Sequence, residues 1–327
     1  MRRLIAVLGL VLLLPFGYYV YANPERLTLN DQGRAEVAGQ YVALSAGITH
    51  YELAGPDTGR VAVLVHGFSV PAYIWDSTSR ALALAGHKVI RYDLFGRGWS
   101  DRPDGAYDGA FYDAQLSELL DSLQVAGPVD LFGLSFGGFV AAHFASTHPE
   151  RVRTLVFVDP VTQSAQSPKL LSVPVIGPAY WQTRVVPSMA DNQTSDFLHP
   201  ERFPGWADRY RPQMQYRGFG RALRRSRGTL GTADFPAMYA KIARWGIPVL
   251  LVWGKQDQTL TIAGAEHVRG AIPGTEFFPV DSAGHLPHLE QAAAFNERVF
   301  AFFASHPVEQ PAESRPPATG SPAAPRR

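Results

Sequence analysis

Hydrophobic residues follow a repeated pattern over two regions of the chain, 40–160 and 245–305. In both regions, short continuous apolar runs alternate with longer segments typical of helices. Such runs indicate strands that are buried on both faces of a parallel sheet. The pattern therefore predicts an α/β fold with right-handed crossovers and helices on both faces of a mostly parallel sheet. Strands are expected at 61–65, 88–92, 128–132, 153–158, 248–253 and 275–280, and helices at 73–85, 111–125, 139–145, 263–269 and 288–304.

Two earlier segments, 41–44 and 48–53, alternate between apolar and polar residues. This alternation is typical of strands with one exposed face, and a short turn separates the two segments. We therefore expect an antiparallel edge on the sheet.

The alternation of strands and helices stops between residues 161 and 244, where prolines, aromatic residues and arginines dominate. This stretch is interpreted as a helical cap inserted above the ends of the strands. Residues 23–39 are expected to form a tether. The segment 306–327 is rich in Pro, Ala and Ser, which predicts a disordered tail.

The amino terminus carries Arg2 and Arg3, followed by an apolar stretch over 4–22. Its length fits either a cleaved signal peptide or an uncleaved membrane anchor, and tyrosines near its end favour the anchor. In both cases the two arginines should stay in the cytoplasm. The catalytic domain is thus expected on the non-cytoplasmic side of a membrane, or exported.

Composition narrows the possible classes of function. The chain has 327 residues, of which 46% are hydrophobic and 18% charged, and its formal net charge is +1. A nucleic-acid-binding protein would usually be strongly basic, so no nucleic-acid partner is expected. The absence of cysteine excludes disulfides, thiolate zinc sites and a cysteine nucleophile. No metal-ligand spacing or phosphate-binding glycine loop is evident, so no cofactor or metal is expected, and the oligomeric state is left open.

The most informative stretch is Gly133-Leu-Ser135-Phe-Gly137, between an expected strand and an expected helix. A sharp turn from strand to helix forces its central residue into a strained conformation, and the flanking glycines remove side chains that would collide. The turn lifts the serine hydroxyl clear of the sheet, and the first N–H groups of the helix face any negative charge that develops there. Ser135 is therefore the predicted nucleophile.

A serine nucleophile needs a base and an acid that orients the base. His285 follows the last expected strand, at the sheet edge where catalytic groups of open α/β sheets gather, whereas His288 starts a helix and is expected to cap or pack. Asp257 follows the preceding strand at the same edge. Asp159 is a rival for the acid, and Asp281 is too close to His285 in sequence. The order Ser135, Asp257, His285 is the order expected for this architecture.

Hydrolysis of an acyl group also requires an oxyanion hole. The expected donors are the backbone N–H of Phe136, directly after the nucleophile, and that of Phe68, in the loop after the strand at 61–65. His66 and Gly67 are expected to shape this loop.

Together, His66-Gly67-Phe68, Gly133–Gly137, Asp257 and Gly284-His285 resemble the motifs of α/β-hydrolase-fold proteins with a cap domain, over residues 40–160 and 245–305. Within the family, the chain looks similar to membrane-associated monoacylglycerol lipases and carboxylesterases. The resemblance implies a serine esterase that forms an acyl-enzyme. A serine nucleophile separates the chain from epoxide hydrolases and haloalkane dehalogenases, which attack through a carboxylate. The loop Asp93–Ser100 also resembles a family loop, in which Asp93 and Arg97 are expected to hold a tight turn.

The cap is locally basic. Between residues 202 and 227 a single acid, Asp208, is outnumbered by arginines at 202, 209, 211, 217, 221, 224, 225 and 227, a local excess of +7. These arginines form either an ordinary solvated surface or a lid that faces anionic lipid headgroups. Most of the aromatic residues among them are expected in the core of the cap, and some are expected to line an acyl pocket.

The sequence favours an ester substrate with an apolar acyl chain, and a membrane surface as a partner. A peptidase, a carbon–carbon bond hydrolase and a perhydrolase would use the same three residues. A non-catalytic receptor of the same fold is a further alternative.

Overall fold

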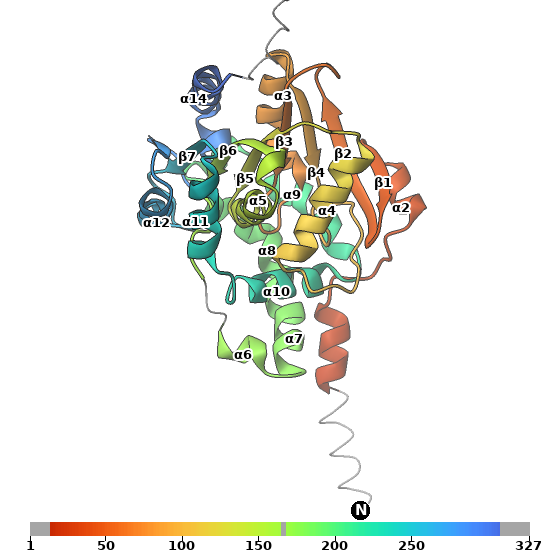
Figure 1. Cartoon of the computed structure of the whole chain (residues 1–327). Coiled ribbons are helices and arrows are strands. Elements are labelled where there is room, and N and C mark those ends of the chain that lie inside the picture. The colour runs from red at the N-terminus through yellow and green to blue at the C-terminus, as the bar shows by residue number, and fades with distance from the viewer. Residues whose placement is uncertain (1–13, 165–167, 308–327) are drawn as a thin grey trace, which may run out of the picture.

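The computed structural model describes residues 14–164 and 168–307. Within them, eight strands form one sheet in the order β1-β2-β4-β3-β5-β6-β7-β8 (Figure 1). The second strand pairs antiparallel with both of its neighbours, and all pairs from β4 to β8 are parallel. The predicted α/β fold and its antiparallel edge are confirmed. The strands are β1 (Gln40–Leu44), β2 (Gly47–Ala54), β3 (Val61–Val65), β4 (Lys88–Tyr92), β5 (Val129–Leu134), β6 (Val152–Val158), β7 (Val249–Gly254) and β8 (Glu276–Val280).

The apolar runs of the central strands are buried on both faces of the sheet. In β3, Val63 and Val65 belong to one hydrophobic cluster, while Ala62 and Leu64 belong to the cluster on the other face. A strand buried on both sides has no polar face, which explains why these segments show no alternation.

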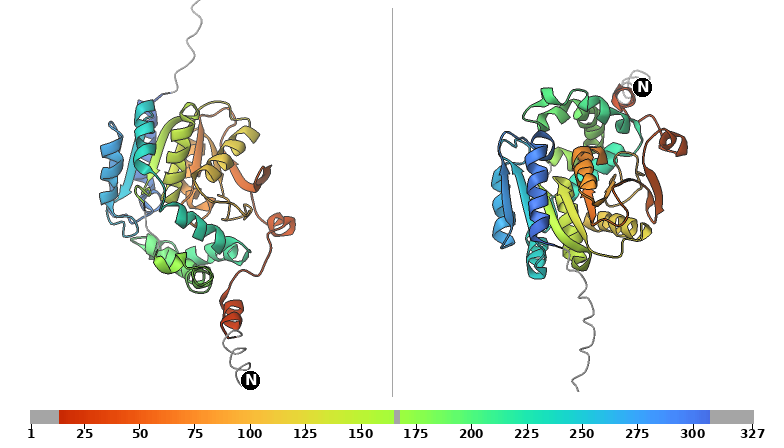
Figure 2. Two further views of the ribbon diagram at one scale, coloured as in Figure 1. Left: turned by 60° about the horizontal axis from the view of Figure 1, so that its bottom comes forward. Right: turned by 90° about the horizontal axis from the view of Figure 1, so that it is seen from above.

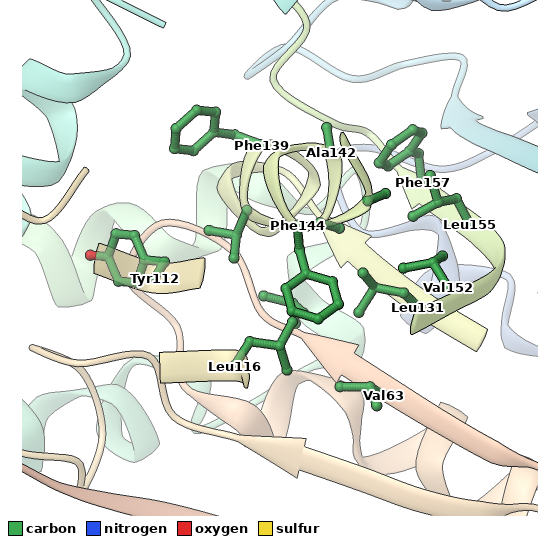
Figure 3. Close-up of a cluster of buried hydrophobic side chains, with 14 of the residues drawn as sticks. Val63, Tyr112, Leu116, Leu131, Phe139, Ala142, Phe144, Val152, Leu155 and Phe157 are labelled. Atoms are coloured by element: carbon green, nitrogen blue, oxygen red, sulfur yellow. The ribbon is translucent and has the colours of Figure 1, made fainter. Parts of the chain in front are cut away.

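Helices cover both faces of the sheet. The left view of Figure 2 shows α11, α5 and α4 side by side on one face. Figure 3 shows Phe144 of α5 beside Leu116 of α4 and Leu131 of β5, all of them fully buried. The helices on this face are α4 (Gly109–Ser122), α5 (Phe136–Thr147), α11 (Phe235–Trp245) and α12 (Ala265–Ala271), and those on the other are α3 (Asp76–Leu84) and α14 (Ala292–Ser305).

The last predicted helix, 288–304, is interrupted. The short helix α13 (Pro287–Glu290) starts at a proline, whose fixed φ suits a first turn, and α14 begins at Ala292. Before the break, the buried Glu290 carboxylate accepts the backbone N–H groups of Gly284 at 2.7 Å and His199 at 2.8 Å. The interruption therefore places Glu290 under the loop that carries His285.

The insertion forms a cap of short helices at one end of the sheet (Figure 1). Its buried aromatic residues, such as Trp181, Tyr210 and Phe219, join the hydrophobic cluster on one face of the sheet. In contrast, α11 packs against α5 and leads into β7, although it lies mostly inside the predicted cap range. We therefore propose that the cap ends near residue 234. The cap helices include α6 (Lys169–Ser172), α7 (Ile176–Tyr180), α8 (Val186–Asn192), α9 (Trp206–Tyr210) and α10 (Phe219–Thr229).

Residues 23–39, predicted as a tether, lie against the cap. The Glu25 carboxylate accepts the backbone N–H groups of Gly218 and Gly220, each at 2.7 Å, and Leu27 pairs with Tyr216 in an isolated bridge. The segment also contains the short helix α2 (Asp31–Ala35). It is thus fixed to the cap by backbone and side-chain hydrogen bonds.

The predicted anchor or signal peptide falls largely on residues 1–13, which lie outside the described residues, as does most of the predicted tail, 308–327. Residues 14–22 are helical and mostly exposed. In the described part of the chain, no helix combines the length and the apolar character needed to cross a membrane.

Candidate active site

Ser135 occupies the turn between β5, which ends at Leu134, and α5, which begins at Phe136. Its backbone is strained, with φ 52° and ψ −116°. A Cβ atom on Gly133 would lie 2.5 Å from the carbonyl oxygen of Gly137, and one on Gly137 would lie 2.4 Å from that of Val65. Both contacts are too short for any side chain, so the turn requires glycine on each side of the serine.

Asp257 and His285 are brought together by the ends of β7 and β8. The His285 Nδ1–H donates to Asp257 Oδ2 at 2.7 Å, and both side chains are almost fully buried. The other oxygen, Asp257 Oδ1, accepts the backbone N–H groups of Thr259 at 2.7 Å and Leu260 at 2.9 Å. These bonds fix the carboxylate, and its position sets the His285 tautomer that leaves Nε2 free to accept a proton.

The pair is also coupled electrostatically. Burial opposes the charged imidazolium of His285, but the nearby Asp257 carboxylate and its hydrogen bond outweigh burial and raise the pKa of His285. Burial likewise acts to raise the pKa of Asp257, but the His285 charge and hydrogen bonds to the carboxylate keep that pKa below its usual value. The arrangement stabilises an imidazolium next to a carboxylate.

The His285 loop is held by the cap as well as by the core. The backbone N–H of His285 donates to the carbonyl oxygen of Asp196 in the cap at 2.8 Å. A Cβ on Gly284 would lie 2.8 Å from that same oxygen, so glycine permits the close approach. The position of the imidazole therefore depends on the cap.

Asp159, the rival for the acid, lies behind Asp257. It is fully buried, and its Oδ1 accepts the backbone N–H of Gly254 at 2.9 Å. Burial and the adjacent Asp257 carboxylate raise the pKa of Asp159 well above its usual value. The raised pKa favours the protonated form of Asp159 beside the Asp257 carboxylate, a role that the sequence prediction missed. Its position at the end of β6 was the available signal.

The other rivals lie elsewhere. Asp281 is exposed and forms an ion pair with Lys255 at 2.8 Å. The buried His288 ring donates from Nε2 to the carbonyl oxygen of Ile74 at 3.1 Å, and burial lowers its pKa to about 3. His288 is thus a neutral packing residue.

Asp159, Asp257 and His285 have ligand-type atoms within 4.8 Å of one another, the spacing of a possible metal site. Two of these atoms already share the Asp257–His285 hydrogen bond. The raised pKa of Asp159 favours a protonated acid, which is a poor metal ligand. The chemistry of the cluster therefore fits proton transfer better than metal binding.

The residues of the predicted oxyanion donors, Phe68 and Phe136, line the larger cavity together with Ser135. Phe136 occupies the first position of α5, where backbone N–H groups have no partner within the helix. Phe68 follows β3, and its ring meets that of Phe136 edge to face at 6.0 Å between centroids. The nearby His66 accepts the N–H of Leu94 at 2.9 Å, and burial lowers its pKa to about 4, so this ring shapes the loop.

Arg97 contributes more than the predicted turn. Its guanidinium is fully buried and donates to the carbonyl oxygen of Phe68 at 2.9 Å and to Ser226 of the cap at 2.9 Å. It also lies over the rings of Phe68 and Phe136. Asp93 holds the turn by accepting the N–H of Trp99 at 2.8 Å. Arg97 thereby connects the Phe68 loop to the cap, a contact that no sequence motif indicated.

Two cavities meet at Ser135 and share Phe68, Ser135 and Thr259 as wall residues. The smaller, of about 260 Å³, contains His285 in its wall and extends toward Asn192 of the cap. The larger, of about 620 Å³, extends under α10 of the cap. The serine therefore lies where the two cavities adjoin.

Comparisons with known proteins agree with this architecture. The family model described as alpha/beta hydrolase fold matches residues 61–292. Pimeloyl-(acyl-carrier protein) methyl ester esterase of Neisseria meningitidis is 26% identical over 245 residues, which are 73% of this chain and 91% of the relative. Among solved structures, the enol-lactonase of Burkholderia xenovorans LB400 has a TM-score of 0.70 at 23% identity, covering 81% of this chain and all of that one.

The meta-cleavage product hydrolase of Pseudomonas fluorescens IP01 has a TM-score of 0.69 at 21% identity, covering 82% of this chain and 98% of that one. At such identities the structural matches support the fold alone. The family model covers well over half of the chain and includes the turn around Ser135 and both Asp257 and His285. The chain therefore belongs to the α/β-hydrolase fold family.

Proposed function

We propose that this protein is a serine hydrolase that cleaves carboxylic esters through an acyl-enzyme on Ser135. The observation that carries the proposal is the buried Asp257–His285 hydrogen bond at 2.7 Å, next to a cavity that His285 shares with the strained serine. The relative named as a methyl ester esterase supports ester chemistry.

In the proposed mechanism, His285 Nε2 accepts the Ser135 proton as Oγ attacks the ester carbonyl. The backbone N–H groups of Phe68 and Phe136 stabilise the resulting oxyanion, while Asp257 stabilises the imidazolium. The imidazolium then donates its proton to the departing alcohol. Water hydrolyses the acyl-enzyme by the same steps, with His285 again acting as base.

The shape of the site supports a substrate with an apolar acyl chain, as a lipid-like ester has. Aromatic and aliphatic residues form much of the larger cavity, among them Phe136, Leu230 and Trp253. A volume of about 620 Å³ is within the range of pockets that bind molecules of medium size.

The test is hydrolysis of p-nitrophenyl esters from acetate to palmitate by the wild type and by Ser135→Ala. Turnover by the wild type alone, with a clear optimum of chain length, is the expected result. A fluorophosphonate should label the wild type but not the variant. Labelling of Ser135 without turnover of any ester would contradict the esterase proposal and favour a peptidase or a carbon–carbon bond hydrolase.

We further propose that the cap contacts a membrane surface. Residues 14–22 and the α6–α7 tip lie at the same end of the molecule (Figures 1 and 2), where Arg184 lies over the ring of Tyr18. Exposed apolar residues at this end include Leu14, Phe16, Leu170, Val175 and Ile176. Exposed apolar side chains gathered at one end are typical of proteins that bind at a lipid interface.

Co-sedimentation of the full chain with phosphatidylcholine–phosphatidylglycerol vesicles tests the membrane proposal. The wild type should sediment with the vesicles, and Ile176→Asp should weaken this binding without changing turnover of a water-soluble ester. Equal binding by both proteins would argue against a role for the α6–α7 tip.

A further inference from the structure

The two cavities beside Ser135 differ in which catalytic group they contain. His285 lines the smaller cavity but not the larger one. Because His285 must donate its proton to the leaving alcohol, the alcohol belongs in the smaller cavity. The acyl half of the substrate therefore extends into the larger cavity, under the cap.

The wall of the larger cavity contains both apolar and polar residues. Phe136, Val161 and Leu230 are apolar, whereas Thr162, Arg227 and His267 supply polar groups. His267 Nδ1 lies 3.2 Å from Thr162 Oγ1. Among the described residues that form this wall, there is no aspartate or glutamate. Arg227 is thus the one permanently charged residue among the described residues of this wall.

Five of the other cap arginines have partners within the protein. Arg209, Arg211 and Arg225 form ion pairs with Asp76, Asp191 and Asp104, respectively, and Arg202 and Arg221 donate to backbone carbonyl oxygens. Most of the predicted basic surface is therefore neutralised or engaged within the protein. It does not present a continuous cationic face.

Within the described ranges of the chain, Arg227 shares its lack of an acidic partner with Arg217 and Arg224, but of these three only Arg227 lines the larger cavity. No acidic side chain within residues 14–164 and 168–307 pairs with it, although its residue is partly buried in the last turn of α10. The negative end of the helix dipole favours a cation at this position. The helix dipole explains a cation at the end of α10, but it does not explain why this arginine lines the cavity assigned to the acyl chain.

We propose that the acyl half of the substrate ends in an anionic group, and that Arg227 binds it. The inference rests on the proposed esterase function and names its substrate class: monoesters of dicarboxylic acids, with an apolar chain between the two carboxyl groups. The apolar chain lies against residues such as Phe136 and Leu230, and the free carboxylate reaches the guanidinium. A guanidinium binds a carboxylate through two parallel hydrogen bonds.

The chemistry of this reaction is that of ordinary ester hydrolysis. Ser135 Oγ forms a bond to the ester carbonyl carbon, and the alcohol leaves with the proton carried by His285. Water then cleaves the acyl-enzyme, which yields a free dicarboxylic acid and restores the serine. The free carboxylate of the substrate takes no part in bond making. Its binding to Arg227 positions the acyl chain so that the ester carbonyl lies next to Ser135.

The test compares two series of substrates of equal chain length: monomethyl esters of dicarboxylic acids from six to ten carbons, and methyl esters of the matching monocarboxylic acids. Arg227→Gln should lower kcat/KM for the anionic series by about 10- to 100-fold, the loss expected for a hydrogen bond to a charged group. The same variant should change kcat/KM for the neutral series by less than about threefold.

Arg217→Gln is the matched control. Arg217 is exposed, has no acidic partner in the described part of the chain, and does not line either cavity at Ser135. The substitution removes the same charge from the cap, so it reports the effect of net charge alone. The proposal would be overturned if Arg217→Gln lowered kcat/KM for the anionic series as much as Arg227→Gln does. It would also be overturned if Arg227→Gln lowered kcat/KM equally for the anionic and the neutral series.

A second readout does not require ester hydrolysis. Free dicarboxylates should protect Ser135 of the wild type from fluorophosphonate labelling better than monocarboxylates of the same length, and Arg227→Gln should abolish that difference. If no ester is hydrolysed but this protection is seen, the anion site stands and the esterase proposal fails. If esters are hydrolysed without any preference or protection by dicarboxylates, the anion site is wrong and the esterase proposal stands.

Discussion

The catalytic edge of the sheet and the cap above it are built in different ways. At the edge, the ends of parallel strands carry Ser135, Asp257 and His285, and each of these residues is held by backbone contacts. The cap consists of short helices and turns, and most of its arginines form ion pairs or bonds to carbonyl oxygens. In the proposed function, the edge fixes the geometry of the reacting groups, and the cap controls which substrate reaches them.

The two regions are nevertheless connected at specific points. Arg97 joins the Phe68 loop to Ser226 of the cap, and Asp196 of the cap accepts the backbone N–H of His285. Changes at these contacts should affect the chemistry as well as the choice of substrate. The following predictions separate the contributions of the core and the cap.

The largest effect is expected where the core holds the catalytic pair. Asp257→Asn should lower kcat by about 10⁴-fold, because an amide cannot stabilise the His285 imidazolium and favours the wrong tautomer. Single-turnover kinetics on a p-nitrophenyl ester measure the acylation step directly.

Asp159→Asn is the matched variant, since Asp159 is the second carboxyl group of the same cluster. The pKa of Asp159 is raised, which favours its neutral form, so a neutral amide of similar size should change the charge beside Asp257 little. We expect kcat to stay within about fivefold of the wild type. A loss as large as that of Asp257→Asn would mean that Asp159 acts as the ionised acid.

Phe144→Ala should cause the largest loss of stability. Phe144 is fully buried between α4, α5 and the sheet (Figure 3), so the substitution leaves a cavity far from Ser135. The free energy of unfolding should fall by about 3–5 kcal/mol. Urea denaturation measures this loss, and the kcat of the folded fraction should be unchanged. A reduced kcat at low temperature would show that the core packing also positions the serine.

The pH dependence of activity tests the coupling between Asp257 and His285. His285 must be neutral to accept the serine proton, and its pKa is raised above the usual value. Activity should therefore fall as the pH decreases through a pKa higher than that of an ordinary histidine. Asp257→Asn removes the carboxylate that raises this pKa, so the acid limb of kcat/KM should move to lower pH. An unchanged acid limb would assign it to another group.

The smallest effect is expected at the surface of the cap. Arg211 pairs with Asp191 at 2.5 Å, but both side chains are largely exposed. Arg211→Gln should change the free energy of unfolding by less than about 1 kcal/mol and leave kcat/KM unchanged for all esters. Thermal unfolding and the ester series provide the two measurements. A marked change in kcat/KM would assign this surface a role in substrate access.

The sequence by itself determined the class of the fold and the positions of the central strands. A strand buried on both faces, such as β3, produces an apolar run that cannot be confused with an exposed strand. The predicted limits of β3 and β4 are those of the structure. The turn at Ser135 was predictable because the glycines of a sharp strand-to-helix turn are a local sequence motif: Gly133 avoids a clash with nearby Gly137, although Gly137 itself avoids one with distant Val65.

Only the tertiary structure decided contacts between segments that are distant in sequence. It placed Asp159 behind Asp257, joined Arg97 to the Phe68 loop and the cap, and fixed the segment 23–39 to the cap through Glu25. It also separated Arg227, in the wall of a cavity, from the arginines that pair with acids. Sequence patterns record the local conformation and the burial of each residue, whereas the pKa of a carboxyl group and the partner of an arginine depend on which charges the fold brings near them.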